Sequence, residues 1–294
     1  MTAVSISATL TEPLHHGAGT SGNTSLLRTQ DVILPDGKHA YVPFLSGNAL
    51  RHKLRDALAW SIVDTLAVPD ESLHKQVVDL LWSGGAITST GAETDLELRR
   101  AVHTAVPALT LLGYAAGSEI VTGTWFSTNL HLVCAENAWR LPPHLATHEL
   151  ATRGAGSYRG EEFGTRHDIT GSPVDRYIQL VGDAAAPKTT QMIYDVQVIT
   201  AGAILAGTGH LTPAATAEQA TTLAAAWELA APTGTDGVRR THLGAKSAHG
   251  YGACILDVDL SGVAMLSDDP VDWWSSNLTR HADEVLPLLG KLAA

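Results

Sequence analysis

Apolar and small polar side chains alternate along the first residues of the chain. Residues 4–10 read Val-Ser-Ile-Ser-Ala-Thr-Leu, which is the period of two typical of a strand with one buried face. A second extended piece runs from Asp31 to Phe44 and is interrupted by Pro35-Asp36-Gly37, a turn signal between two strands. The pattern predicts a strand and a hairpin, separated by a loop rich in Gly, Ser and Thr from His16 to Ser25.

The period changes after Pro43. Apolar residues then recur at helical spacing, at Ala49, Leu50, Leu54, Leu58, Ile62 and Leu66. This spacing predicts an amphipathic helix from Asn48 to about Leu66. Both Ser46 and Asn48 carry side chains suited to cap its first turn.

The rest of the chain repeats these two signals. Strand-like alternation covers residues 120–134, 191–204 and 253–260, and helical patterns cover 74–82, 95–102 and 214–230. Gly123 is expected at a bulge. Residues 152–188 have few apolar runs, which indicates a functional insertion or a mobile segment. The order of elements predicts an α+β fold, a ferredoxin-like sheet with large excursions.

Composition narrows the class of protein. Hydrophobic residues make up 45% of the 294 residues and charged residues 17%, which fits a globular chain with a large core. No apolar run is long enough to span a membrane. The first residues lack an export signal, so we expect the cytoplasm. Cys134 and Cys254 have no metal-ligand spacing around them, and we expect reduced, buried thiols.

The formal net charge of −11 lowers the expectation of nucleic-acid binding, because domains that bind nucleic acid are usually basic. Net charge describes the long-range field, however, and not the local groove. Residues 45–55 are locally basic, and residues 153–166 are mildly so. The charge therefore does not exclude RNA binding.

The predicted helix start offers an anion site. Gly47 allows a sharp turn into a helix whose first amides point free, and free amides bind anions. Arg51 and Arg55 lie one turn apart beside them, so one phosphate could meet amides and guanidiniums together. An ordinary capped helix with a solvated basic face explains the same spacing and is the commoner case.

A second glycine-rich segment spans residues 244–252. Its glycines permit a close approach of backbone to a ligand, and Lys246 with Ser247 could hold a phosphate or a sugar. The segment lacks the Walker pattern, because no Gly-Lys-Ser/Thr step opens a helix there. A plain turn between a helix and a strand is the alternative.

Together the two segments resemble the RAMP superfamily of CRISPR-associated proteins. Residues 46–56 read Ser-Gly-Asn-Ala-Leu-Arg-His-Lys-Leu-Arg-Asp, and residues 243–252 read Leu-Gly-Ala-Lys-Ser-Ala-His-Gly-Tyr-Gly. Residues 14–17, Leu-His-His-Gly, and 22–28, Gly-Asn-Thr-Ser-Leu-Leu-Arg, fit the same family. The likeness, from about residue 4 to 260, is to the backbone subunit that polymerises along guide RNA, with type IV complexes as the preferred subtype.

The resemblance implies a hand-shaped subunit made of one domain, residues 1–294. Its palm would be an RRM-like or ferredoxin-like sheet, residues 67–118 a finger-like helical insertion, and residues 145–190 a thumb β-hairpin. The implied partners are guide RNA, further copies of this chain in a helical filament, other effector subunits at its ends, and target nucleic acid paired to the guide. The implied role is antiviral or anti-plasmid defence, with no cofactor, no metal and no membrane.

The resemblance also implies which residues bind RNA. By position these are Arg28, Ser46, Asn48, Arg51, Arg55, Gly244, Lys246, Ser247, His249 and Gly250. Charge and location alone add the thumb arginines Arg153, Arg159 and Arg166. Contacts of this kind would hold phosphates and riboses and leave base pairing to choose the sequence.

One departure from the family concerns catalysis. RNA-cleaving relatives carry an aspartate in the loop after the first strand, and the matching position here is Asn23. An amide serves neither as a general base nor as a hard-cation ligand. Asp31 lies further along the chain, but nothing in the sequence positions it to substitute. We therefore expect no cleavage of the target.

The remaining side chains suited to chemistry have simpler explanations. Most of the 14 histidines are expected at the surface or at caps, although His15 or His16 could serve a guide-processing ribonuclease. Trp60 and Trp82 fall on predicted helices and are expected in the core. The pair Trp273-Trp274 is expected in the core or at a subunit interface.

Two alternatives to a filament subunit stay open. The first is an RNA endonuclease of the same superfamily, active through Asp31 or a histidine. The second is an unrelated soluble enzyme or binding protein whose glycine-rich loop holds a small phosphate ligand. The filament hypothesis predicts oligomers that lengthen on RNA, whereas the small-ligand hypothesis predicts a chain indifferent to RNA.

Overall fold

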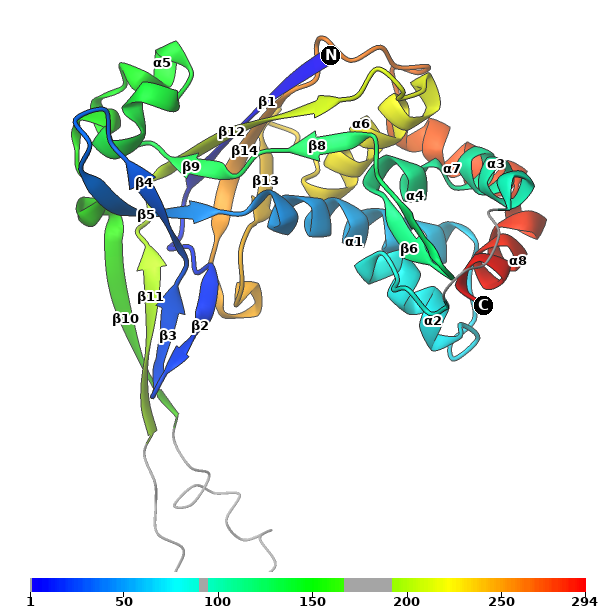
Figure 1. Cartoon of the computed structure of the whole chain (residues 1–294), viewed down its shortest axis with the longest axis horizontal. Coiled ribbons are helices and arrows are strands. Elements are labelled where there is room, and N and C mark those ends of the chain that lie inside the picture. Colours follow the sequence, from blue (N-terminus) through cyan, green and yellow to red (C-terminus); the bar gives the residue numbers. More distant parts are fainter. Residues whose placement is uncertain (1, 90–94, 167–191) are drawn as a thin grey trace, which may run out of the picture.

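The computed structural model describes residues 2–89, 95–166 and 192–294 (Figure 1). Its largest sheet has its strands in the order β13-β14-β1-β12-β9-β5-β4, and β8 also pairs with β12. These strands are β1 (Thr2–Leu10), β4 (Thr29–Ile33), β5 (His39–Leu45), β8 (Trp125–Ser127), β9 (Leu130–Leu132), β12 (Ile204–Leu211), β13 (Arg239–His242) and β14 (Ala253–Asp259).

The predicted strand β1 forms the middle of this sheet. It pairs antiparallel with β12 on one side and with β14 on the other. Its alternate residues Val4, Ile6, Ala8 and Leu10 are at most 1% exposed. Because successive side chains of a strand point to opposite faces, these four residues bind the sheet to the core. The predicted hairpin is confirmed as β4 and β5, with Gly37 at the turn in a left-handed conformation.

Two long helices cover the buried face of the sheet. Helix α1 (Gly47–Thr65) begins after β5 and ends within one residue of its predicted end, and Ser46 is its N-cap. Helix α6 (Ala217–Ala230) follows β12 and packs against α1. Leu54 of α1 and Trp227 of α6 share the core cluster with Ile6. The chain is therefore an α+β protein, as its sequence predicts.

A second, smaller sheet extends away from this body (Figure 1). It consists of β10 (Arg159–Arg166), β11 (Met192–Ile199), β3 (Thr24–Leu27) and β2 (Gly17–Ser21), in that order. The loop expected from His16 to Ser25 is wrong, because this segment forms the β2–β3 hairpin. Its small polar residues show no alternation of apolar and polar side chains that would predict a strand. Thr24 and Ser25 are instead stabilised by parallel pairing with β11.

A helical part lies at the other end of α1. It holds α2 (Lys75–Val78), the π-helical turn η1 (Asp79–Ser83), α3 (Leu96–Ala105), α4 (Pro107–Leu112), α7 (Pro270–Arg280) and α8 (Ala282–Ala293), beside the hairpin β6 (Tyr114–Ala116) and β7 (Glu119–Val121). The short helix α5 (Pro143–Ala146) lies apart from this helical part (Figure 1), and its Leu145 packs in a small apolar cluster with Val133, just after β9. The helices expected at 74–82 and 95–102 are confirmed.

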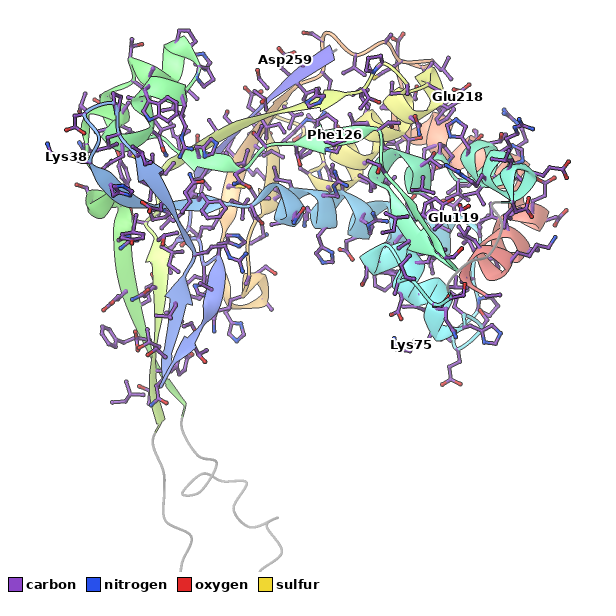
Figure 2. The ribbon with its side chains drawn as sticks, viewed as in Figure 1. Lys38, Lys75, Glu119, Phe126, Glu218 and Asp259 are labelled. Carbon is purple, nitrogen blue, oxygen red and sulfur yellow. The ribbon has the colours of Figure 1, made fainter. Side chains whose placement is uncertain are left out.

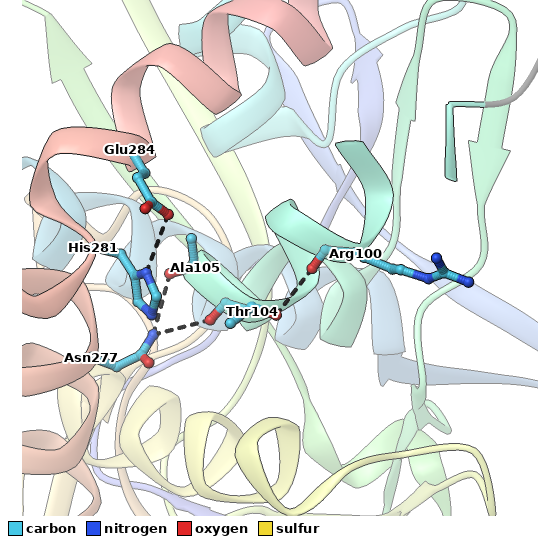
Figure 3. Close-up of polar contacts among 6 residues, drawn as sticks. All are labelled: Arg100, Thr104, Ala105, Asn277, His281 and Glu284. Atoms are coloured by element: carbon cyan, nitrogen blue, oxygen red, sulfur yellow. Dashed lines mark hydrogen bonds and ion pairs between the residues drawn. The ribbon is translucent and has the colours of Figure 1, made fainter. Parts of the chain in front are cut away.

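Helices α7 and α8 were not predicted from the sequence. Pro270 at the start of α7 and the N-cap Asp269 are standard helix signals. Buried Asn277 of α7 donates to the carbonyls of Thr104 and Ala105 at the end of α3 (Figure 3). The C-terminal helices are thus fixed to the helical part through main-chain acceptors that α3 leaves unpaired.

Three expectations about single residues can now be judged. Gly123 does not form a bulge: the segment 120–134 divides into three short strands, and Gly123 passes so close to Gly113 that a Cβ on it would lie 2.5 Å from the Leu111 carbonyl oxygen. Trp60 is not in the core, because it is 55% exposed. Trp274 is fully buried and donates to Ser61.

Both cysteines are free and buried, as expected. Burial raises the pKa of each thiol to about 12, with a contribution from Glu136 at Cys134. No helix among the described residues is long and apolar enough to cross a bilayer.

The contact of α7 with α3 predicts a loss of stability on substitution. Asn277→Ala removes the donor from two carbonyls and should lower the free energy of unfolding by about 1–3 kcal/mol. Urea denaturation followed by circular dichroism measures the loss. The neighbouring Ser276 is exposed, so Ser276→Ala is the matched control and should stay within about 0.5 kcal/mol of wild type. Equal stability of the two variants would show that the Asn277 contact is dispensable.

Candidate nucleic-acid interface

The glycine-rich loop lies directly on the segment that follows β1. The Ala245 N–H donates to the His15 carbonyl at 2.8 Å, and the Gly252 N–H donates to the Pro13 carbonyl at 2.7 Å. Gly244 has φ +80°, and a Cβ there would lie 2.5 Å from the His15 oxygen. A larger residue at this position would therefore push the two backbones apart.

Lys246 leaves this loop toward the small sheet. Its backbone is left-handed, with φ 63°. Its ammonium lies 6.0 Å from the centre of the Tyr194 ring on β11, a distance at which a cation is attracted to an aromatic face. The Tyr194 ring covers Gly164, since a Cβ on Gly164 would lie 2.3 Å from that ring. A lysine and an aromatic ring are thus held together beside the loop.

The loop has a second link to the same strands. The Tyr251 hydroxyl is hydrogen-bonded to Glu162 of β10, and burial together with this carboxylate raises the pKa of Tyr251 to about 12. Ser247, His249 and Gly250 between these links are exposed. The loop therefore presents a hydroxyl, an imidazole and an ammonium from a backbone anchored at both ends.

The start of α1 differs from the predicted anion site. The Ser46 side chain accepts from the Ala49 N–H, and the Gly47 N–H donates to the Asn129 side chain at 3.0 Å. These amides are occupied and not free for a phosphate. Asn48 is exposed, so among the predicted helix-start residues it remains available to a ligand.

Arg51 and Arg55 point into the protein, not toward a shared phosphate. Arg55 is 7% exposed and donates to the carbonyls of Leu112 and Gly113, and Arg51 donates to Leu112 and to Trp125. The carbonyl end of a helix attracts cations, and α4 ends at Leu112. Burial lowers the pKa of Arg51, and it lowers that of Arg55 to about 10, with a contribution from Arg51.

The sequence missed this role for a physical reason. Helical spacing places both arginines one turn apart, but it does not say what lies opposite that face of the helix. The unpaired carbonyls at the end of α4 lie there, some 57 residues further along the chain. These guanidiniums fix the helical part to α1, so a phosphate role for them is corrected to a structural one.

The thumb arginines divide between different surroundings. Arg159 of β10 is exposed and, with Leu27 and Gln197, lines a pocket of about 340 Å³. Because side chains alternate along a strand, Arg159 lies on the face of β10 opposite Glu162, away from the glycine-rich loop. Arg153 is exposed before β10. Arg166 ends β10, and its side chain lies outside the described part of the chain.

Arg28 and the paired histidines sit where the two sheets join. Arg28 is exposed and donates to the Gly17 carbonyl. His15 donates to the Gln197 carbonyl, and His16 accepts from the Ser46 N–H at 3.3 Å. Burial, with Arg28 and His15 nearby, lowers the pKa of His16 to about 4. Both imidazoles therefore have main-chain partners, which explains them without a catalytic role.

Sequence reasoning overlooked the exposed aromatic and apolar side chains of the hairpin. Phe163 is 73% exposed and Ile193 57%, and Tyr194 lies beside Lys246. Alternation over residues 192–199 was visible, but not which face the loop would cover. Asn23 donates to the Ile193 carbonyl at 3.1 Å, so its amide connects the β2–β3 turn to β11. Within the described ranges, no group of three or more His, Cys, Asp or Glu residues is arranged to hold a metal ion.

The fold of this chain resembles those of known structures. The fold is similar to that of a chain in a solved structure titled "Type IV-B CRISPR Complex", with a TM-score of 0.57 and 17% sequence identity. The match covers 92% of this chain and 96% of that chain. No family model matches the sequence, and no curated protein matches it. At this identity the likeness shows a shared fold.

Two half-buried histidines predict a dependence of stability on pH. The pKa values of His16 and His131 are about 4, mainly because of burial, against an ordinary value of 6.5. Between these two pH values the histidines bind protons in the unfolded chain but not in the folded chain. The free energy of unfolding should therefore be highest above about pH 6.5 and decrease toward pH 4. The double variant His16→Gln, His131→Gln should lose less stability between pH 7 and pH 5 than wild type in urea titrations. An equally steep loss in both proteins would contradict this assignment.

Proposed function

We propose that this chain is a non-catalytic, RNA-binding backbone subunit of a CRISPR effector ribonucleoprotein, of type IV by its structural likeness. The observation that carries the proposal is the shared fold with a chain of a Type IV-B CRISPR complex over nearly the whole length of both chains. The sequence motifs at residues 14–17, 22–28, 46–56 and 243–252 support it independently of the fold.

The order of strands supports a ferredoxin-like palm. Strands β14, β1, β12 and β9 lie side by side and antiparallel. Helix α1 lies between β1 and β9 in sequence, and α6 lies between β12 and β14. This matches the strand-helix-strand-strand-helix-strand order of the ferredoxin-like fold. Strand β13 extends the sheet beyond β14, and β5 and β4 extend it beyond β9.

The other two parts of a hand have counterparts. Residues 67–118 contain α2, α3 and α4 and correspond to the proposed fingers. Strands β10 and β11 form an antiparallel pair that corresponds to the base of the proposed thumb, while residues 167–191 between them lie outside the described part of the chain. The division into palm, fingers and thumb is part of the proposal.

The proposed RNA surface centres on the glycine-rich loop. Lys246 supplies a phosphate partner, and Ser247 and His249 lie within reach of the same backbone. Gly244 and Gly250 allow a close approach of main chain to ligand. Tyr194, which the sequence did not suggest, offers a ring on which a base can stack. Binding through phosphate and ribose is indifferent to base sequence.

Further side chains extend this surface. Asn48 is exposed at the start of α1, and Arg28 is exposed at the junction of the two sheets. Arg153, Arg159 and Arg166 belong to the proposed thumb, with Arg159 on the face opposite the loop. Arg51 and Arg55 contribute indirectly: they hold the proposed fingers against α1, the helix that carries Asn48.

The proposal includes the absence of cleavage by this subunit. Asn23 stands where RNA-cleaving relatives carry a carboxylate, and its amide is engaged with β11. An amide takes no proton from a ribose hydroxyl. Asp31, the alternative carboxylate, lies on the edge strand β4 with His39 as its partner.

The proposal predicts RNA bound to the purified protein. Purification without nuclease should give a high ratio of absorbance at 260 to 280 nm and elongated particles that RNase shortens. A clean monomer that still binds no RNA when mixed with guide RNA and partner subunits would overturn the proposal in favour of a small phosphate ligand. Bound RNA that wild type shortens, and that Asp31→Asn leaves intact, would favour the endonuclease alternative.

The glycine-rich loop predicts a uniform loss of RNA affinity. Lys246→Asn removes the ammonium but keeps a residue that tolerates the left-handed backbone. It should weaken binding several-fold for RNAs of unrelated sequence and reduce the salt slope by roughly 0.7, the value for one contact to a single strand.

Filter binding at several salt concentrations measures both quantities. The matched control is Lys38→Asn, because Lys38 is exposed in the β4–β5 turn (Figure 2) and pairs with Asp36 at 2.8 Å. It should leave affinity and slope unchanged. A loss confined to one RNA sequence, or equal losses in both variants, would contradict the assignment of Lys246.

A further inference from the structure

An apolar groove opens at the end of α1, on the helical part of the molecule. It has a volume of about 460 Å³, and Trp60, Val63, Leu73, Val78 and Trp82 form its apolar lining. The RNA surface lies at the opposite end of the same helix. This groove is therefore separate from the glycine-rich loop and from the small sheet.

The indole of Trp60 is both exposed and fixed in orientation. It is 55% exposed, which is unusual for a side chain that gains so much free energy on burial. Its ring centre lies 5.4 Å from that of Trp82, with the two planes at 80°. Trp82 packs against the core, so it holds the Trp60 ring without covering it. One face of a positioned indole is left to a partner.

The rim of the groove is acidic. Asp70 and Glu71 line it, and neither forms an ion pair with any residue that the structure describes. Residues 60–82 contain four carboxylates and one lysine. That lysine, Lys75, pairs with Asp79 of η1. The groove thus combines uncompensated negative charge with an aromatic face.

We propose that this groove docks a basic, extended segment of a partner protein. An arginine or lysine of that segment stacks on Trp60 and directs its charge toward Asp70 and Glu71, while an adjacent aliphatic side chain packs against the apolar lining. A cation on an indole face gains from the ring quadrupole, and the two carboxylates add to the same attraction. This proposal does not rest on RNA binding by the chain.

Charge decides against two other occupants. A nucleic acid stacked on Trp60 would bring its phosphates to Asp70 and Glu71, whereas stacking platforms for nucleic acid have basic surroundings. In a second copy of this chain the adjacent Arg239 and Arg240 already pair with Glu228 and Asp236, so they are not free to enter the groove. The occupant that matches the groove is a different, basic protein.

The test uses the full chain and two labelled peptides. The first is fluorescein-Gly-Leu-Arg-Val-Arg-Leu-Gly-amide, and in the second both arginines are replaced by glutamate. In fluorescence anisotropy at low salt the arginine peptide should bind, and the glutamate peptide should bind at least about tenfold more weakly. Trp60→Ala should weaken binding of the arginine peptide about tenfold, and Asp70→Asn with Glu71→Gln about fivefold with a flatter salt dependence.

The control variant is Trp139→Ala. Trp139 is 57% exposed, like Trp60, but lies in another part of the chain beside Arg140, and its loss should change nothing. Trp60→Phe keeps an aromatic face and should restore most of the affinity if Trp60→Ala is impaired in folding. RNA binding by Trp60→Ala should equal that of wild type, which separates this proposal from the proposed function.

Four results would overturn the proposal. The arginine peptide failing to bind wild type, or binding Trp60→Ala equally well, would remove the groove as its site. Equal binding of the glutamate peptide would show that the carboxylate rim selects nothing. Displacement of the arginine peptide by a single-stranded RNA that Trp60→Ala no longer binds would assign the groove to nucleic acid instead.

Discussion

Four consecutive residues, 13–16, join every part of the proposed RNA surface. Pro13 and His15 accept from the glycine-rich loop, and Leu14 exchanges two main-chain hydrogen bonds with Ile199 of β11. The His16 imidazole accepts from the Ser46 N–H at the start of α1, and the His16 carbonyl accepts from the Arg28 N–H. Because one short stretch of backbone holds the loop, the small sheet and the helix start, their positions are fixed together. Residues distant in sequence would then face the proposed RNA without large rearrangement.

Much of the fold could be predicted from local pattern. Strand β1 and helix α1 satisfy their own periods, since each packs one face against the core, and the β4–β5 hairpin has a clear turn signal. Strands β2 and β3 could not be predicted, because their small polar residues are stabilised by pairing with β11 and not by a buried face. The direction of Arg51 and Arg55 was equally hidden, since it depends on carbonyls that only the folded chain brings opposite α1. Motifs located the glycine-rich loop, but Tyr194 beside it required the structure.

The positions of the arginines bear on the net negative charge of the chain. Arg51 and Arg55, near the start of α1, donate to internal carbonyls. The surface near the glycine-rich loop therefore has few cations. If the chain binds RNA as proposed, a subunit with few cations would release few counterions and bind a single strand weakly. Strong attachment would then need many subunits on one strand, each adding a small increment. An acidic exterior would also discourage such subunits from associating before RNA joins them.

Helix α1 carries part of the proposed RNA surface at its first turn and the acidic groove toward its last. Asn48 and Trp60 are 12 positions apart on one continuous helix, which corresponds to roughly 18 Å along its axis. A helix packed along its length is stiff, so the distance between the two surfaces is constant. Subunits repeated along an RNA would repeat the groove with the same pitch. The length of a partner that docks several basic segments would then have to match the number of subunits.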